Sequence, residues 1–103
     1  MLTACIVCAS RKEAEKIAVA LVEGGLAACV NYFPCRSVFK WNGRLQKKAE
    51  WALLAKTADS LYARLERRVK KLHSYETPCV IAWKDERANA KYAAWVKRNC
   101  STA

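Results

Sequence analysis

The fold is decided by residues 26–56, which read LAACVNYFPCRSVFKWNGRLQKKAEWALLAK. Near the middle of this stretch, Asn42 and Gly43 both tolerate the positive φ that a two-residue type I′ turn requires, and this pair is the strongest short hairpin signal. The arms on either side are about a dozen residues each, which is long for strands in a small domain. Pro34 cannot donate to a sheet ladder, so we expect the first strand, Leu26 towards Lys40, to be interrupted there and to be bent, bulged or at a sheet edge.

A strand and a helix precede this hairpin. The short apolar run from Leu2 to Ala9 predicts a buried strand. The sequence from Ser10 to Glu13 predicts a capping box, in which the serine hydroxyl and the glutamate carboxylate each accept a hydrogen bond from a backbone amide. Apolar residues at helical spacing follow as far as Val22. Gly24-Gly25 predicts that the helix ends there, with a glycine in the left-handed conformation.

A second helix, a strand and a short last helix follow the hairpin. The second helix is expected to be capped by Thr57 or Asp59, and its buried stripe comprises Leu61, Leu65, Val69 and Leu72. Residues 79–83 predict the fourth strand, and a final helix is expected from about Asn89 to Arg98. The return arm of the hairpin is expected from Arg44 to Lys56.

This order of elements predicts an α+β fold. The succession βαββαβ is the ferredoxin-like arrangement, in which two helices cover one face of an antiparallel sheet, here with an additional C-terminal helix. Residues 1–103 are long enough for a single domain and too short for two. A long aromatic hairpin left in solvent is an aggregation hazard, and pairing it with other copies in a closed cyclic oligomer removes that hazard.

Composition and charge narrow the classes of function. Nineteen Lys and Arg against nine Asp and Glu give a formal net charge of +10, which favours acidic partners such as nucleic acid. The densest basic group, residues 64–71, falls on the second predicted helix and reads as a solvated face. No apolar run approaches the ~20 residues of a membrane span. The first residues carry no basic segment, so we expect no signal peptide and a cytoplasmic location.

The six cysteines are expected to be free thiols, because the chain is apolar enough to fold unaided and shows no secretion signal. Cys5 and Cys8 lie three apart on a predicted strand and therefore point to opposite faces, so they do not form a shared site. Three cysteines are expected to be packing residues, namely Cys29, Cys79 and Cys100. Cys35 is the cysteine expected to be exposed, and its redox state is left open.

Several short motifs together resemble the CutA divalent-cation tolerance family over nearly the whole chain. The matching residues are Leu26-Ala27-Ala28-Cys29-Val30-Asn31, Ser37, Trp41 with Gly43, Glu50, Lys56-Thr57, His73 with Tyr75 and Pro78, and Tyr92 with Trp95. Each motif is weak by itself, but their order and spacing are specific. The resemblance implies a ferredoxin-like protomer in a homotrimer held together by long hairpin strands. It also implies a response to divalent cations such as copper, and a likeness to PII-type signalling proteins.

The resemblance also implies a metal site for copper(II) or zinc(II), whose ligands would be Cys8 and His73, and no organic cofactor. Thiolate and imidazole are the donors that these ions prefer. The alternative is that Cys8 is a core thiol and His73 a capping or surface histidine. Some members of the family have a second histidine where this chain has Leu72, and the family commonly has a proline where it has Ser74. We therefore expect weak or inter-subunit binding rather than a tight site.

Four further residues, Trp41, Glu50, Lys56 and Tyr75, are expected to contact a ligand or to form a subunit interface. The four tryptophans are expected to contribute to the core and the interface. No nucleophile elbow, phosphate-binding glycine loop or paired acidic motif is present, so the chain is not expected to be an enzyme. The alternative function is a nucleic-acid-binding module using the basic surface. It is disfavoured because the first strand lacks aromatic residues for base stacking.

Overall fold

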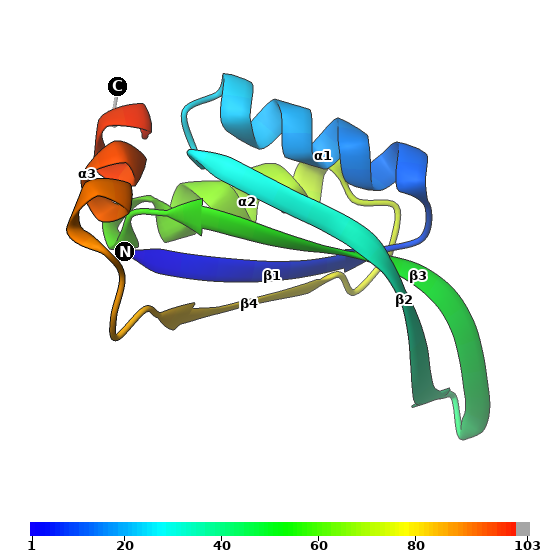
Figure 1. Ribbon diagram of the computed structural model, residues 1–103. Coiled ribbons are helices and arrows are strands. Elements are labelled where there is room, and N and C mark those ends of the chain that lie inside the picture. The colour runs from blue at the N-terminus through cyan, green and yellow to red at the C-terminus, as the bar shows by residue number, and fades with distance from the viewer. Residues whose placement is uncertain (101–103) are drawn as a thin grey trace.

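A computed structural model describes residues 1–100 of the chain (Figure 1). Its elements, in order, are β1 (Leu2–Cys8), α1 (Arg11–Glu23), β2 (Cys29–Trp41), β3 (Arg44–Thr57), the 3₁₀ turn η1 (Asp59–Leu61), α2 (Tyr62–Leu72), β4 (Cys79–Lys84) and α3 (Ala90–Asn99). The strands form one antiparallel sheet in the order β2-β3-β1-β4. The predicted ferredoxin-like α+β fold with an extra C-terminal helix is therefore confirmed.

The sheet has one covered face and one open face (Figure 1). α1 and α2 lie on the covered face, while α3 lies at one end of the sheet, near the N-terminus. On β1, Ala4, Ile6 and Cys8 are fully buried within the main core. Because side chains alternate along a strand, Cys5 and Val7 lie on the open face. The helices supply the rest of that core through Ala14, Ile17, Ala18, Leu21, Leu65 and Val69.

The hairpin is more regular than the sequence indicates. Asn42 has φ 52° and Gly43 has φ 75°, as a type I′ turn requires. The pairing of β2 with β3 runs without a break from Cys29 opposite Lys56 to Trp41 opposite Arg44. The expected interruption at Pro34 is therefore wrong, as is the expected start at Leu26. Proline is tolerated because β2 is an edge strand, one of the three arrangements that Pro34 predicts.

The hairpin divides into a base and an extension. The base comprises residues 29–35 and 50–57, and its side chains Val30, Tyr32, Trp51, Leu53 and Ala55 pack in or against the core. The extension comprises residues 36–49 and curls away from the rest of the sheet (Figure 1). It gives the molecule extents of 45 × 26 × 21 Å and a radius of gyration of 14.1 Å. A compact chain of this length has about 13 Å, so the extension is an arm rather than part of the globular body.

The helix caps agree with the sequence at α1 and differ at α2. The Ser10 side chain accepts from the Glu13 amide, and Gly25 adopts φ 72° after the helix ends. The Glu13 carboxylate accepts from the Ala9 amide, one residue before the cap. Neither Thr57 nor Asp59 caps α2, because the η1 turn precedes the helix and has no side-chain cap. The expected cap is therefore wrong.

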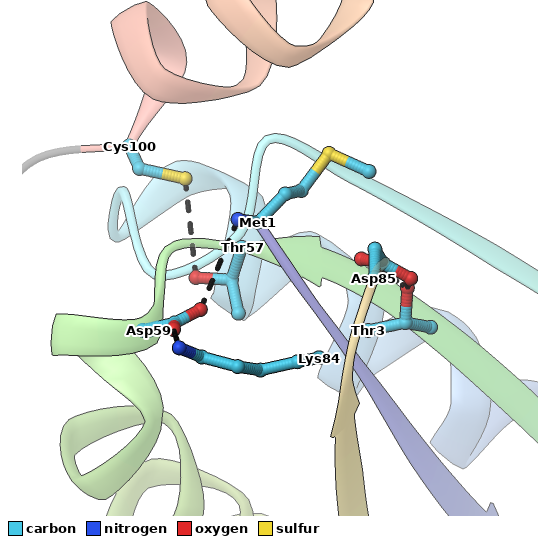
Figure 2. A network of polar contacts seen from close by, with 7 residues as sticks. All are labelled: Met1, Thr3, Thr57, Asp59, Lys84, Asp85 and Cys100. Carbon is cyan, nitrogen blue, oxygen red and sulfur yellow. Dashed lines mark hydrogen bonds and ion pairs between the residues drawn. The ribbon is translucent and has the colours of Figure 1, made fainter. Parts of the chain in front are cut away.

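Asp59 and Thr57 instead belong to contacts that join the ends of the chain (Figure 2). Asp59 contacts the Met1 amine at 3.8 Å and Lys84 Nζ at 3.1 Å. The Thr57 hydroxyl donates to the Leu26 carbonyl at 2.7 Å and lies 3.9 Å from the Cys100 sulfur. These contacts hold the start of β1 and the end of β4 against the η1 turn, and the end of α3 against the end of β3.

Two expectations about side-chain packing are corrected by the exposures. Cys79 is exposed rather than packed, and Cys35 is half-buried rather than exposed, while Cys29 and Cys100 are half-buried. The tryptophans were expected in the core and the interface: Trp51 packs against the core, whereas Trp41, Trp83 and Trp95 are exposed in the protomer, so their place in an interface stays a prediction. The exposed tryptophans lie on the hairpin extension, on the β4 edge strand and on α3.

Candidate functional site

A groove opens where the hairpin extension leaves the body of the sheet. It has a volume of about 650 Å³ and is bounded by the extension, the end of β1 and the segment that joins α2 to β4. Its lining includes Val7, Ser37, Val38, Phe39, Trp41, Gln46, Lys48, Glu50, Ser74, Tyr75, Glu76, Thr77 and Cys79. The lining mixes apolar and aromatic surface with a few polar groups, which is the usual chemistry of a small-ligand site.

Glu50 and Tyr75 form the polar centre of the groove. Glu50 is only 5% exposed, and its Oε2 accepts a hydrogen bond of 2.5 Å from the Tyr75 hydroxyl. Burial and the neighbouring carboxylate together raise the pKa of Tyr75, so the phenol stays protonated and keeps donating. Lys48 Nζ lies 5.8 Å from the centre of the Tyr75 ring, within reach of a cation–π contact.

The segment that carries Tyr75 is fixed by Glu13 at the start of α1. Glu13 Oε2 accepts from the Ser74 amide at 2.7 Å, and Oε1 accepts from the Ser74 hydroxyl at 3.1 Å. Burial opposes ionisation of Glu13, but the hydrogen bonds from Ser74 and Ala9 outweigh it and lower the pKa of the carboxyl. Ser74 is therefore a donor that holds the rim of the groove.

His73 is buried, and both of its ring nitrogens are engaged. Nε2 lies 2.7 Å from the Val7 carbonyl oxygen, which can only accept, so Nε2 carries the proton. Nδ1 accepts from the Tyr75 amide at 3.1 Å. These two bonds define a neutral imidazole with no free lone pair, which ties the end of α2 to the end of β1.

Cys8 lies at the end of β1, is fully buried, and has a thiol directed at the Ser10 carbonyl oxygen at 3.7 Å. Burial and the nearby Glu13 charge raise the pKa of Cys8 to about 11, which disfavours the thiolate that binds metal. Among residues 1–100, no three His, Cys, Asp or Glu side chains converge as a metal site. As arranged in the protomer, Cys8 and His73 therefore do not fit a resident copper(II) or zinc(II) ion.

The structure brings together three of the four residues expected at a ligand site or interface. Trp41, Glu50 and Tyr75 line the groove. Lys56 lies at the other end of β3, opposite Cys29, and its Nζ donates to Asn31 on the neighbouring strand. Sequence reasoning missed Lys48 in the groove, because a lysine on an exposed strand gives no signal of its position.

This geometry defines the chain as a ferredoxin-like domain with a long hairpin arm and a polar groove at the base of that arm. The CutA1 divalent ion tolerance protein family matches residues 2–99, and the chain belongs to this family. A relative from Archaeoglobus fulgidus, described as a divalent-cation tolerance protein CutA, is 42% identical over 87 residues, which are 84% of this chain and 85% of the relative.

Two solved structures share the fold over almost their whole length. The periplasmic divalent cation tolerance protein CutA from Archaeoglobus fulgidus has a TM-score of 0.94 at 39% identity, covering 96% of this chain and 98% of the neighbour. CutA1 from Oryza sativa has a TM-score of 0.96 at 33% identity, covering 99% and 94%. The description of the family names ion tolerance and no chemical reaction. Among residues 1–100, no helix is long and apolar enough to cross a membrane.

Proposed function

We propose that the chain acts in divalent-cation tolerance as a non-enzymatic homotrimer, assembled through its hairpin extensions, that binds a cation or small ligand in the groove. The observation that carries this proposal is the exposed apolar surface of the extension. Val38 is 66% exposed, Leu45 60% and Trp41 51%. A monomer that leaves such a surface in water at the end of a long strand pair exposes an association site.

Closed symmetry explains why the assembly stops at a small number of copies. The edge strand β2 presents unpaired backbone groups along its outer side, and a second chain satisfies them by pairing there. A cyclic arrangement leaves no such edge free, whereas an open chain of copies continues to grow. Three copies is the number that the family resemblance implies.

The groove is the natural ligand position in this assembly because it adjoins the surface that a neighbouring copy covers. Glu50 offers a carboxylate, Lys48 a cation and Trp41 an exposed indole at one place. The Tyr75 hydroxyl keeps the Glu50 carboxylate oriented. A small polar ligand or a hydrated cation satisfies these groups without displacing the core.

Binding of copper(II) or zinc(II) at Cys8 and His73 is a separate part of the proposal and requires a rearrangement. The His73 ring would first release Val7 or Tyr75, and Cys8 would lose its proton. Both costs weaken a site built from these two residues, consistent with the weak binding expected from the sequence.

Native mass spectrometry with and without copper(II) tests the assembly and the metal together. We expect a trimer in both conditions, and a monomer for the double variant Val38→Asp/Leu45→Asp. The matched control Val19→Asp/Val22→Asp places the same charges on exposed apolar positions of α1 and is expected to remain trimeric. A monomeric wild-type protein, or an unchanged double variant, overturns the proposed assembly.

Calorimetry tests the two ligand positions. Copper(II) or zinc(II) binding at Cys8 and His73 is expected to weaken in Cys8→Ala and His73→Ala, whereas binding in the groove is expected to weaken in Glu50→Gln. Absence of heat from either metal, or wild-type binding by all three variants, contradicts metal binding at these positions. Cytoplasmic location belongs to the same proposal and is tested by cell fractionation. The periplasmic description of the Archaeoglobus fulgidus relative is the competing outcome.

A further inference from the structure

Two free thiols lie next to one another on the open face of the sheet, away from Cys8 and the buried His73. β1 pairs with β4 so that Cys5 faces Ile81 and Val7 faces Cys79. Cys5 and Cys79 are therefore diagonal neighbours on adjacent antiparallel strands. Val80, between Cys79 and Ile81, packs against the core on the covered face, so the Cys79 side chain points to the open face, as that of Cys5 does.

The spacing of this pair suits a bridging ion better than a disulfide. Diagonal neighbours lie about 7–8 Å apart at Cα and closer at Cβ. A disulfide needs Cα atoms within roughly 4.4–6.8 Å, so the bond would require the backbone to move. A metal–thiolate bond is about 2.3 Å long, so an ion between two sulfurs spans about 4.6 Å. The side chains can bridge that distance from their positions on the two strands.

Nothing else in the described chain occupies these thiols. Both cysteines are free, Cys5 half-buried and Cys79 exposed. Burial raises the pKa of Cys5, and the Cys79 thiol and then the Cys35 thiol raise it further, because neighbouring thiolates repel. A cation placed between the sulfurs removes that repulsion. Each thiol releases its proton to solvent as its sulfur binds the ion.

The number of donors selects the ion. Zinc(II) takes four ligands in structural sites, and residues 1–100 contain no group of three converging His, Cys, Asp or Glu donors. Monovalent copper and silver are soft ions that thiolates select, and two sulfurs in a line complete their coordination. The flanking Val7 and Ile81 side chains make the surroundings of the pair apolar, which favours a low coordination number.

We propose that Cys5 and Cys79 form a two-thiolate site for a soft monovalent metal ion, copper(I) or silver(I). Cys79 and the flanking Val7 also belong to the lining of the groove, so this site lies at the edge of the groove and on the same face of the sheet. It differs from the Cys8 and His73 position in its residues, its face of the sheet and the charge of the ion it takes. Its failure leaves the family membership and the proposed assembly untouched, because neither depends on Cys5 or Cys79.

The test titrates the reduced full-length protein with copper(I) under anaerobic conditions against a chromophoric copper(I) chelator. We expect wild type to withdraw a single ion per chain from the chelator, and X-ray absorption to show two sulfur neighbours at the metal. Cys5→Ser and Cys79→Ser are each expected to lose this ion. The matched controls Cys100→Ser and Cys8→Ser are expected to keep it.

Three outcomes overturn the site. These are failure of the wild type to compete with the chelator, retention of the ion by both Cys5→Ser and Cys79→Ser, and loss of the ion in Cys8→Ser while the other two variants retain it. Circular dichroism of each variant establishes that it is folded. A zinc(II) titration of the same proteins is expected to show no difference between wild type and Cys79→Ser.

Discussion

The base and the extension of the β2–β3 hairpin share one uninterrupted pairing register but have opposite surroundings. Leu53 in the base is fully buried, whereas Leu45 in the extension, on the same strand, is 60% exposed. The backbone hydrogen bonds are the same kind in both halves. The contrast shows that one continuous strand pair can be packed against the core of its own chain at one end and exposed at the other.

The groove lies at the junction of these two halves. Glu50 is the first buried residue after the exposed run of β3, and it carries the Tyr75 hydrogen bond. Side chains on the body side are held by the core, whereas on the extension side Lys48 reaches the Tyr75 ring and other side chains, such as Val38 and Leu45, are exposed. A second copy seated on the extension would therefore change the groove directly.

The largest effect expected from this contrast separates the two leucines of β3. Leu53→Ala removes a fully buried side chain and is expected to lower the free energy of unfolding by about 2–5 kcal/mol at every protein concentration. Leu45→Ala is expected to change it by less than about 0.5 kcal/mol in the dissociated chain, as for other surface substitutions. Urea denaturation at several protein concentrations measures both effects.

If the loss in free energy of unfolding caused by Leu45→Ala depends on protein concentration, the extension is an association surface. Equal losses for the two variants at high dilution contradict the division of the hairpin into a packed base and an exposed extension.

The next effect concerns the junction. Tyr75→Phe leaves the buried Glu50 carboxylate without its hydroxyl donor and is expected to cost about 1–3 kcal/mol of stability. Tyr32→Phe is the matched control, because the Tyr32 hydroxyl donates to the exposed Glu15 at 3.0 Å; its expected cost is below about 0.5 kcal/mol. Thermal unfolding at neutral pH distinguishes them, and equal costs would show that Glu50 is not held by Tyr75.

A smaller effect is expected at the turn of the extension. Gly43→Ala forces a side chain into φ 75°, and no other atom lies within 4 Å of the added Cβ, so the cost is confined to the backbone at about 1 kcal/mol. Asn42→Gly is the control and is expected to change stability by only a few tenths of a kcal/mol, because glycine adopts φ 52° readily. A neutral Gly43→Ala variant would contradict the type I′ geometry.

The smallest effect is a pH dependence in the body. The pKa of Glu13 is lowered in the folded state, so its stabilisation is fully present above the ordinary pKa of 4.5 and is lost as pH falls through the folded value. Because Glu13 is partly exposed, solvent screening keeps this contribution small. The unfolding midpoint of the wild type is expected to fall as the pH is lowered, and Glu13→Gln is expected to reduce that fall. The control Glu23→Gln, at the other end of α1, is expected to leave it unchanged.

Local patterns predicted most of the body correctly. The Ser10 cap, the Gly25 stop and the Asn42-Gly43 turn each depend on residues adjacent in sequence, so their chemistry is readable without a fold. The errors occurred where a distant residue decides the outcome. Asp59 could cap a helix, but it contacts Met1 and Lys84 instead. Pro34 was expected to interrupt its strand, but the edge position of β2 leaves its missing donor without consequence.

The candidate site was predicted less completely for the same reason. Cys8 and His73 were expected to meet where a strand end and a helix end converge, and the His73 ring does bond the Val7 carbonyl beside Cys8. The sequence could not show that both ring nitrogens are engaged, because one partner is on β1 and the other is the Tyr75 amide. Whether Cys8 and His73 bind a metal stays a prediction.

The sequence by itself determined the hairpin, the order of the elements and the family, because hydrophobic period, turn residues and motif spacing are local properties of the chain. Only the tertiary structure decided which halves of that hairpin are covered and which groups meet in the groove. It also decided that Cys5 and Cys79 are neighbours, although they are far apart in the chain. Strand order and register set these contacts, and both arise from packing across the whole sheet rather than from any one segment.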